Sequence, residues 1–598
     1  MKKLLTGNEA IAQGAWEAGC KIASAYPGTP STEILEYFAT LEGIYAEWAP
    51  NEKVALEVAA GAAIGGIRSM TAMKHVGLNV AADPLFTMAY EGVNGGFVVV
   101  SADDPGMHSS QNEQDNRFYA MHAKIVCIEP SDSQEALDFT KAAFDISEQY
   151  DTIVLLRSTT RISHSKSIVE VSDKPQIHLK EYKKNIEKYI MIPANARKRH
   201  PVVEENLQKI AKASYSSPLN KVEYNLNKNI NGKKIGIITS GISYQYAKEV
   251  FGDNVSFLKF GITYPLSFDL IDEFVSKLDE IFIIEENDPF LELQIKAHGI
   301  KCKGKELIPI VGELNPDIIR KAFDNYFNKN DEKTEEIKIE SIPVPNRPPV
   351  LCSGCPHRGI FHEISKVKKA IITGDIGCYT LGMMPPLNAM DTCICMGASI
   401  SAGIGLQKAI LMQNKDQKVF AFIGDSTFFH SGITGLMDAV YNKIPITVVI
   451  LDNRITAMTG HQENPGTGKT LMGESTLSID LVELVKALGV KQENIKVVHS
   501  YILSEIKNAI DFALNTNDVS VIISKQPCAL LKEEAKKRKP VYYSIDNEIC
   551  KLCKACLKIG CPSISFSDNT VKIDPNTCFG CSICYQTCKF GAIKLKNK

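Results

Sequence analysis

The residues with the clearest chemical signature are eight cysteines gathered near the end of the printed sequence. In the first run, Cys550, Cys553 and Cys556 are each separated by two residues, and Cys561 follows after four more. The second run consists of Cys578, Cys581, Cys584 and Cys588. The chain has 17 cysteines in all. Such a local density in a chain expected to be cytosolic indicates metal or redox chemistry rather than disulfide bonds.

The repeated CxxCxxC spacing is typical of a domain that binds two [4Fe–4S] clusters, in which the fourth cysteine of each run ligates the other cluster. We therefore predict one cluster on Cys550, Cys553, Cys556 and Cys588. We predict the other on Cys561, Cys578, Cys581 and Cys584. The extra residue before Cys561 loosens the match but removes no ligand. Two zinc ribbons are the alternative, and they require CxxC pairs separated by a longer gap.

A second group of candidate ligands carries oxygen atoms at the ends of two predicted strands. The apolar runs 419–423 and 446–451 are typical of buried parallel strands, and a helix-like segment separates them. Asp425 and Asn453 follow these strands, at the edge where open α/β sheets bind ligands. A carboxylate and an amide oxygen suit Mg²⁺ that is shared with phosphate groups. The alternative is an aspartate that caps the next helix.

The composition excludes some classes of function. The 598 residues are 44% hydrophobic with a formal net charge of −2, so we expect no nucleic-acid partner. No apolar run reaches the length of a membrane span, and the first ten residues lack the apolar stretch of a signal peptide. We expect a cytoplasmic protein without membrane contact, with roughly four domains at this length.

Strands alternate with helix-like segments in three regions, which predicts doubly wound parallel α/β sheets that hold these residues. Charged and proline-rich stretches mark the linkers. The predicted parts are an α/β domain at 1–165, a linker or insertion at 166–233, a small α/β domain at 234–327, a linker at 328–349, a third α/β domain at 350–531 and an α+β two-cluster domain at 540–598.

One predicted helix of the first domain, from Asn51 to Gly66, is so rich in alanine and glycine that it must pack very closely. Glu57 lies within it. A glutamate in such a dry environment has a raised pKa and can donate a proton. Glu52 is the competitor, although its place near the helix start favours a first-turn role. The alternative for Glu57 is an exposed carboxylate on the helix surface.

Several other residues have open interpretations. Arg117, in a polar loop, either binds a carboxylate or is solvated at the surface. Cys352 and Cys355 form a lone CxxC, a possible half of a zinc site, but no second pair lies close by. For six of the seven remaining cysteines we expect small buried hydrophobic side chains: Cys20, Cys127, Cys302, Cys393, Cys395 and Cys528.

These motifs together resemble those of the thiamine-diphosphate-dependent 2-oxoacid:ferredoxin oxidoreductases. Gly424-Asp425-Ser426 and Asn453 resemble the family's "GDG … N" motif, with Ser426 in place of the second glycine. The segment "YPGTPSTEI" around Thr29 resembles the family's Tyr-Pro-x-Thr-Pro-Ser loop. The segment 352–357 resembles the CxGCxH that opens the diphosphate-binding domain.

The resemblance implies roles for individual residues. Asp425, Asn453 and the backbone carbonyl of Ile455 would hold Mg²⁺ against the diphosphate. Thr29 would lie near the substrate's carboxylate, and Glu57 would contact the aminopyrimidine of thiamine. His357 is implied as a catalytic residue that also contacts the cofactor. Further cofactor contacts are implied for Cys355, Gly377, Cys378, Gly424, Ser426, Thr459 and Gly460.

The resemblance also implies an activity and partners. The reaction would be the oxidative decarboxylation of arylpyruvates with coenzyme A, with electrons passing through two [4Fe–4S] clusters to ferredoxin. A smaller β subunit would complete an assembly with two copies of each chain. The alternatives are another 2-oxoacid (pyruvate, 2-oxoisovalerate or 2-oxoglutarate), a non-oxidative decarboxylase, and an electron-carrier subunit without thiamine chemistry. Whether the active site forms within one chain or across a dimer interface stays open.

Overall fold

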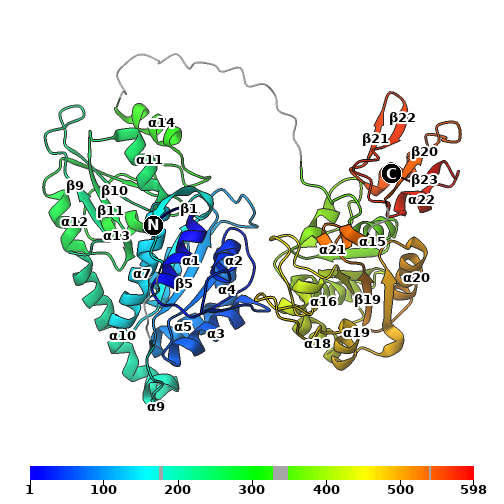
Figure 1. Cartoon of the computed structure of the whole chain (residues 1–598), viewed down its shortest axis with the longest axis horizontal. Helices are drawn as coiled ribbons and strands as arrows, with labels where there is room; N and C mark the ends of the chain where they lie inside the picture. The colour runs from blue at the N-terminus through cyan, green and yellow to red at the C-terminus, as the bar shows by residue number, and fades with distance from the viewer. Residues whose placement is uncertain (174, 176–178, 328–347, 538–539, 598) are drawn as a thin grey trace. The chain divides into compact units, whose positions relative to one another are not determined.

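The computed structural model describes residues 1–173, 175, 179–327, 348–537 and 540–597. The chain divides into two compact units, Met1–Lys338 and Ile339–Lys598, which we treat separately (Figure 1). Of the predicted linker at 328–349, residues 328–347 lie outside the described residues. No helix in the described ranges is long and apolar enough to cross a membrane.

The larger sheet of the first unit has seven strands in the order β12-β6-β7-β5-β4-β2-β3. Their bounds are β2 (Ile22–Ala25), β3 (Tyr45–Trp48), β4 (Ser69–Lys74), β5 (Phe97–Asp103), β6 (Val126–Ile128), β7 (Val154–Thr159) and β12 (Ile262–Tyr264). All neighbours are parallel except β12, which runs antiparallel to β6. Every residue of β5 is buried, as expected for a central strand covered by helices on both faces.

The helices of this part of the unit alternate with the strands, and one close approach between them requires glycine. The bounds are α1 (Gly7–Glu17), α2 (Thr32–Phe38), α3 (Glu52–Ile64), α4 (His75–Val80), α5 (Ala82–Glu91), α6 (Arg117–Ala123), α7 (Ser133–Tyr150) and α8 (Thr160–His164). Helices α1 and α7 pack so closely that a Cβ at Gly14 would lie 2.4 Å from the carbonyl oxygen of Leu137. The first strand, β1 (Lys2–Thr6), pairs with β8 (Lys166–Glu170).

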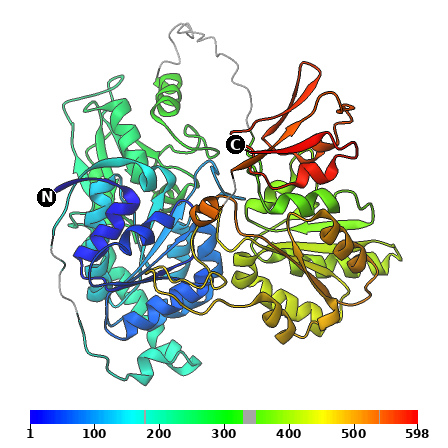
Figure 2. The same cartoon turned by 45° about the vertical axis from the view of Figure 1, so that its right-hand side comes forward.

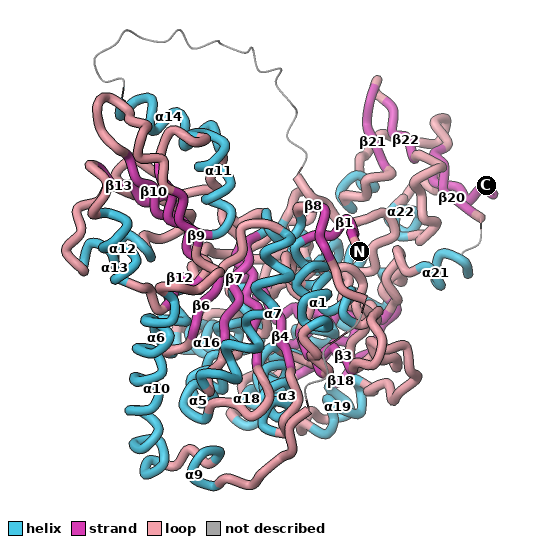
Figure 3. The backbone as a smooth tube through the Cα atoms, turned by 60° about the vertical axis from the view of Figure 1, so that its left-hand side comes forward, coloured by secondary structure: helices cyan, strands magenta, loops and turns pink. Residues whose placement is uncertain are grey.

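A second sheet of the first unit has the order β13-β10-β11-β9. Its strands are β9 (Lys221–Glu223), β10 (Ile235–Ser240), β11 (Ser256–Phe260) and β13 (Glu280–Ile284), and the helices of this region are α9 (Ile186–Tyr189), α10 (Pro193–Ser214), α11 (Gly241–Phe251), α12 (Phe268–Val275), α13 (Phe290–Ala297) and α14 (Pro316–Phe327). The stretch 166–233, predicted as a linker or insertion, therefore contributes a sheet strand and a long helix. Strand β12, which follows β11 in the sequence, pairs with β6 of the seven-stranded sheet, so the second α/β region contributes one strand to the first sheet (Figure 3).

The second unit contains a six-stranded parallel sheet in the order β15-β14-β16-β17-β19-β18. Its strands are β14 (Ala370–Gly374), β15 (Thr392–Cys393), β16 (Lys418–Gly424), β17 (Thr447–Asp452), β18 (Ile495–His499) and β19 (Ser520–Lys525). The helices are α15 (His357–Ile364), η1 (Cys378–Met383), α16 (Ala398–Met412), α17 (Asp425–Thr427), η2 (Phe428–Gly432), α18 (Ile433–Tyr441), α19 (Leu481–Ala487), η3 (Gln492–Asn494), α20 (Leu503–Leu514) and α21 (Lys532–Lys537). Strands β16 and β17 are buried along their whole length.

The cysteine-rich end of the second unit is a small α+β region that contains two antiparallel strand pairs. Antiparallel β20 (Val541–Ile545) and β23 (Ile593–Asn597) form one pair, and β21 (Ile564–Ser567) and β22 (Thr570–Ile573) form the other. Two short helices complete it, η4 (Ala555–Ile559) and α22 (Ile583–Thr587). Figure 2 shows these strands in red and orange beside the rest of their unit. The doubly wound α/β fold and the C-terminal α+β region agree with the sequence-based expectation.

Candidate functional site

The candidate magnesium site lies where β16 and β17 end side by side. The parallel register pairs Gly424 with Leu451, so the residues that follow each strand emerge at the same edge. Asp425 is 3% exposed, and burial raises the pKa of its carboxyl to about 7, with Asp452 as the next cause. The Asn464 side-chain amide donates a hydrogen bond to Asp425 Oδ2 over 3.2 Å. A divalent cation beside this buried carboxylate would keep it ionised, so these residues fit the predicted ion.

Asn453 provides the second predicted ligand and is buried. Its Oδ1 accepts a hydrogen bond from the Ile455 amide over 3.3 Å, which folds the backbone of this loop tightly around the side chain. His357 Nε2 lies 3.5 Å from Asn453 Nδ2. Burial lowers the pKa of His357 to about 4, so its imidazole is neutral at pH 7. The structure thus brings His357, Asn453 and the Asp425 strand end into one part of the second unit.

Tyr379 forms a wall of this site that the sequence did not indicate. A Cβ on Gly424 would lie 2.6 Å from its ring, and a Cβ on Gly377 would lie 2.3 Å from it. Both predicted glycines therefore make room for the same aromatic ring. The Tyr379 hydroxyl donates to the carbonyl of Ile376 over 2.8 Å. The signal that could have identified Tyr379 is its position next to Cys378, an expected cofactor contact.

Ser426, the residue that departs from the family motif, has a defined partner. The Thr456 hydroxyl donates to Ser426 Oγ over 2.8 Å, so the serine ties the loop after β16 to the loop after β17. Thr459 Oγ1 donates to Gln462 Oε1 over 2.6 Å. Gly460 has a φ of 127°, a backbone conformation that favours glycine.

Four cysteine thiols lie near one another close to this site. Burial raises the pKa of Cys378 to about 11, and the neighbouring thiols of Cys528 and Cys352 raise it further. Burial raises the pKa of Cys355 to about 12, and the thiols of Cys378 and Cys352 also contribute. Cys528 Sγ lies 3.8 Å from His461 Nε2. The four thiols come from three segments, namely the Cys352–Cys355 pair and the two loops that contain Cys378 and Cys528.

This grouping corrects part of the sequence analysis. Cys528 does not stand alone as a buried hydrophobic side chain, and the lone CxxC has two further thiols beside it in space. Sequence distance hid them, because the loops after different parallel strands meet at one edge of the sheet. Cys20 and Cys127 are buried as expected, whereas Cys302 and Cys528 are only half-buried and Cys393 and Cys395 are exposed. Among the described residues, no three His, Cys, Asp or Glu side chains are arranged to hold a single metal ion.

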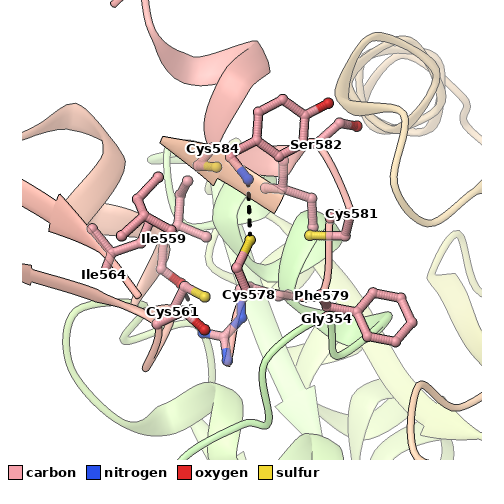
Figure 4. A pocket seen from close by; sticks show the side chains of 15 residues that line it. Gly354, Ile559, Cys561, Ile564, Cys578, Phe579, Cys581, Ser582 and Cys584 are labelled. Carbon is pink, nitrogen blue, oxygen red and sulfur yellow. Dashed lines mark hydrogen bonds between the residues drawn. The ribbon is translucent and has the colours of Figure 1, made fainter. Parts of the chain in front are cut away.

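The eight C-terminal cysteines line two separate cavities. The inner cavity is lined by Cys561, Cys578, Cys581 and Cys584 (Figure 4). The outer cavity is lined by Cys550, Cys553, Cys556 and Cys588. These are the two predicted ligand sets, with the fourth cysteine of each run placed at the other cavity. The Tyr543 amide lies 3.5 Å from Cys578 Sγ as a hydrogen-bond donor, an orientation that suits a thiolate ligand.

In the first unit, the surroundings expected of Glu57 are not found within the chain. Its side chain is 44% exposed and forms an ion pair with Lys53 one helical turn away. Glu52 is 5% exposed instead, and a Cβ on Gly77 would lie 2.7 Å from Glu52 Cγ. The dry environment predicted for Glu57 therefore belongs to Glu52. The sequence shows how rich the helix is in small residues, but not which of its faces is covered.

Thr29 and Arg117 also have surroundings that the sequence left open. Thr29 is half-buried in the loop between β2 and α2. A Cβ on the adjacent Gly28 would lie 3.1 Å from Lys74 Cβ, so this loop runs against the end of β4. Arg117 is 1% exposed and pairs with Asp115 and Glu285. The expected bidentate contact with a carboxylate is found, since Arg117 Nε and Nη2 donate to the two oxygens of Asp115. The alternative, a solvated surface arginine, is wrong.

Two family models match the sequence. Residues 13–228 match "Pyruvate flavodoxin/ferredoxin oxidoreductase, thiamine diP-bdg", and residues 375–524 match "Thiamine pyrophosphate enzyme, C-terminal TPP binding domain". These ranges contain Thr29 and Glu52 in the first unit and the strand ends of β16 and β17 in the second. Each unit thus contains a region that matches a thiamine-binding family model.

Curated relatives match over nearly the whole chain. The indolepyruvate oxidoreductase subunit IorA of Archaeoglobus fulgidus is 42% identical, covering 99% of this chain and 97% of its own length. The subunit of the same name from Pyrococcus horikoshii is also 42% identical with the same coverage. A solved 2-oxoglutarate:ferredoxin oxidoreductase from Magnetococcus marinus is 19% identical, covers 55% of this chain and 65% of its own, and has a TM-score of 0.47.

Proposed function

The chain belongs to the family of the indolepyruvate oxidoreductase subunit IorA, and on this premise we propose that it catalyses the oxidative decarboxylation of arylpyruvates, indolepyruvate above all. Coenzyme A would accept the acyl group and ferredoxin the electrons. The observation that carries this proposal is the identity of 42% over 99% of the chain, because the shared length includes both thiamine regions and both cysteine cavities.

The second unit would hold the charged end of the cofactor. Asp425, Asn453 and the carbonyl of Ile455 would bind Mg²⁺, which shares its oxygen ligands with the diphosphate. Thiamine diphosphate supplies the carbanion chemistry by which a 2-oxoacid loses CO₂, and iron–sulfur clusters accept the electrons one at a time. The other proposed cofactor contacts are Cys355, His357, Gly377, Cys378, Gly424, Ser426, Thr459 and Gly460.

His357 and Glu52 are the residues we propose to hold or move protons. The buried imidazole of His357 is neutral, so it can accept or donate a hydrogen bond without bringing a charge into the site. Thiamine chemistry also requires a carboxylic acid at the aminopyrimidine. The burial of Glu52 against Gly77 supports it for this role, and Glu57, which lies on the exposed face of the same helix, stays the alternative. We retain Thr29 as the candidate for the substrate's carboxylate.

We propose two [4Fe–4S] clusters, one on Cys561, Cys578, Cys581 and Cys584 and one on Cys550, Cys553, Cys556 and Cys588. The grouping of these thiols around two cavities supports that assignment. A smaller β subunit would be the partner, in a cytoplasmic assembly with two copies of each chain. The word "subunit" in the names of the relatives supports a partner.

The experiment is an anaerobic assay of the chain purified together with its smaller partner. Reduction of a dye that substitutes for ferredoxin is measured with indolepyruvate, phenylpyruvate, pyruvate, 2-oxoisovalerate and 2-oxoglutarate, with and without coenzyme A. We expect the highest kcat/KM for the aromatic acids, a strict requirement for coenzyme A, and release of thiamine diphosphate on denaturation. A higher kcat/KM for an aliphatic 2-oxoacid would overturn the substrate, and a preparation without thiamine diphosphate would overturn the chemistry.

A further inference from the structure

A buried arginine joins the inner cysteine cavity to the segment Cys352–His357. Arg358, the second residue of α15, is 2% exposed. Its Nη1 donates to the carbonyls of Ile559, over 3.0 Å, and Gly560, over 2.6 Å. Its Nη2 donates to the carbonyls of Leu351 and Cys352. One guanidinium therefore holds four carbonyl oxygens from two segments that are about 200 residues apart in sequence.

The guanidinium of Arg358 lies between the two regions. Arg358 lines the inner cavity together with Cys561, Cys578, Cys581 and Cys584. The same guanidinium contacts the start of the Cys352–His357 segment through the carbonyls of Leu351 and Cys352. One buried cation is therefore part of the cavity wall and of the contact with that segment.

One hydrogen-bond donor of Arg358 is not used. Its Nε is buried and has no hydrogen-bond partner among the described residues. A buried N–H without an acceptor is costly. The residue lines a cavity whose predicted occupant carries sulfur atoms, and such atoms accept hydrogen bonds that alter a cluster's reduction potential.

Further contacts hold the Cys352–His357 segment in place, so that its position does not depend on Arg358 alone. Ser353 Oγ and Ser563 Oγ lie 2.6 Å apart. The Tyr501 hydroxyl donates to the carbonyl of Gly354 over 2.6 Å. Gly354 has a φ of +71°, and a Cβ there would lie 2.2 Å from the ring of Phe579. The backbone of the Cys352–His357 segment therefore touches the residue next to a predicted cluster ligand.

The outer cavity has different surroundings. Its lining comes entirely from residues between Ile545 and Ile593, and its cationic side chains are the exposed Lys551 and Lys554. A charge in water is screened much more strongly than a buried charge. The two predicted cluster sites therefore differ in whether a desolvated cation is part of their wall.

We propose that Arg358 is a positioning residue that couples the inner cluster site to the Cys352–His357 segment and holds a positive charge and a free N–H against the inner cluster, but not the outer one. This inference rests on the proposed function only in requiring that the inner cysteines carry a cluster. The Arg358 side chain would link the thiamine region to the inner cluster site and would also raise the reduction potential of that cluster.

The first test is a redox titration of the anaerobically purified full-length enzyme, followed by electron paramagnetic resonance. We compare wild type, Arg358→Gln and Arg358→Lys, with Lys554→Gln as a control that removes one cation beside the outer cysteines. In Arg358→Gln, one cluster signal should shift to a more negative midpoint potential. At a fixed potential, the reduced fraction of that cluster should fall about tenfold. Arg358→Lys should shift it less.

The control fixes the interpretation of the titration. Lys554→Gln should leave the signal affected by Arg358→Gln unchanged. Unchanged potentials in Arg358→Gln, or equal shifts of both signals, would overturn the proposal. The iron content of the wild type separates the two hypotheses: a wild-type chain without iron at the inner cysteines would refute the proposed function before Arg358 is tested.

The second test measures the mechanical link without any activity. Hydrogen–deuterium exchange of the same preparations is followed in peptides covering 351–356 and 557–563. Both peptides should exchange faster in Arg358→Gln, while a peptide from β17 should keep its protection. Arg358→Lys keeps the charge and should fold if Arg358→Gln does not. Unchanged exchange in both peptides, in a variant that folds, would rule out the coupling.

Discussion

Two acidic residues, Asp425 and Glu57, are predicted from the sequence to face a cofactor, and the structure gives them opposite surroundings. Asp425 is 3% exposed at the end of a buried parallel strand. The Glu57 side chain is 44% exposed on a helix surface and pairs with Lys53. The end of a parallel strand fixes where the next residue must lie, whereas a helix composed mostly of small residues has several faces that could be covered.

The largest expected effect is the loss of turnover when the proposed acid, Glu52, is replaced while Glu57 is kept. Glu52→Gln should lower kcat by about 100- to 10,000-fold, the usual contribution of a positioned acid or base. Glu57→Gln should keep near wild-type kcat, because it removes only an exposed ion pair with Lys53. The two variants are matched, since each converts one glutamate of the same helix, and turnover with indolepyruvate is the measurement.

The opposite result would restore the sequence-based assignment. A loss of turnover in Glu57→Gln, with Glu52→Gln active, would mean that the exposed face of α3 is covered in the assembled enzyme. Bound thiamine diphosphate should be measured in both variants, to separate loss of the proton donor from loss of the cofactor.

The second-largest effect is expected from the replacement of Asp425. Asp425→Asn should lower turnover by about 100-fold or more, with loss of bound thiamine diphosphate and Mg²⁺, because an amide oxygen is a much weaker ligand for a hard cation than a carboxylate. Metal and thiamine contents are measured after gel filtration. Asp438→Asn, at an exposed position of α18, is the control and should retain both cofactors.

Asp425→Asn should also stabilise the cofactor-free chain at pH 8. Burial raises the pKa of Asp425 to about 7, above its unfolded value of about 3.9. The folded chain therefore holds a proton that the unfolded chain loses, and stability falls as pH rises from about 4 to 7. Asp425→Asn removes this cost, so its chemical denaturation midpoint should exceed that of wild type at pH 8. The advantage should disappear near pH 4 or when Mg²⁺ and thiamine diphosphate are added.

His357 should make the folding stability depend on pH in the opposite direction, and by a smaller amount. Burial lowers its pKa to about 4, below the unfolded value of about 6.5. Between these values the unfolded chain binds the extra proton, so stability is lost as pH falls from about 6.5 to 4, by up to roughly 3 kcal/mol. His357→Gln should flatten the pH dependence of the denaturation midpoint in this window. An equal slope in His357→Gln and in the control His499→Gln, at an exposed position, would contradict this.

The sequence predicted the features that depend on a few neighbouring residues, but not those that depend on contacts between distant segments. The cluster ligand sets and the strand ends of β16 and β17 follow from local patterns, CxxCxxC spacing and buried apolar runs, that act over a few residues. Cys528 joins Cys352 and Cys378 only because separate loops meet at one sheet edge. Local patterns contain no information about such a meeting.

The sequence also did not show which charged or polar stretches are enclosed by other parts of the chain. Arg117 lies in a polar loop sequence, yet it is enclosed with Asp115 and Glu285, and Glu285 directly follows β13 of the second sheet. The stretch 166–233 carries no motif, yet it supplies β9 to that sheet. In both cases the partner that gives the residue its environment is far along the chain, so that composition alone suggests a solvated surface or a linker.

The smallest expected effect tests the one departure from the family motif. Ser426→Gly would restore the glycine and remove the acceptor of the 2.8 Å hydrogen bond from Thr456. The loss of one such bond should cost about 1 kcal/mol of stability, measured by chemical denaturation. The apparent affinity for thiamine diphosphate should weaken by only a few-fold, because the backbone around Asp425 and Asn453 retains its other contacts. A loss of cofactor as severe as in Asp425→Asn would show that the serine itself contacts the diphosphate, since a link between two loops can only position the ligands and cannot replace them.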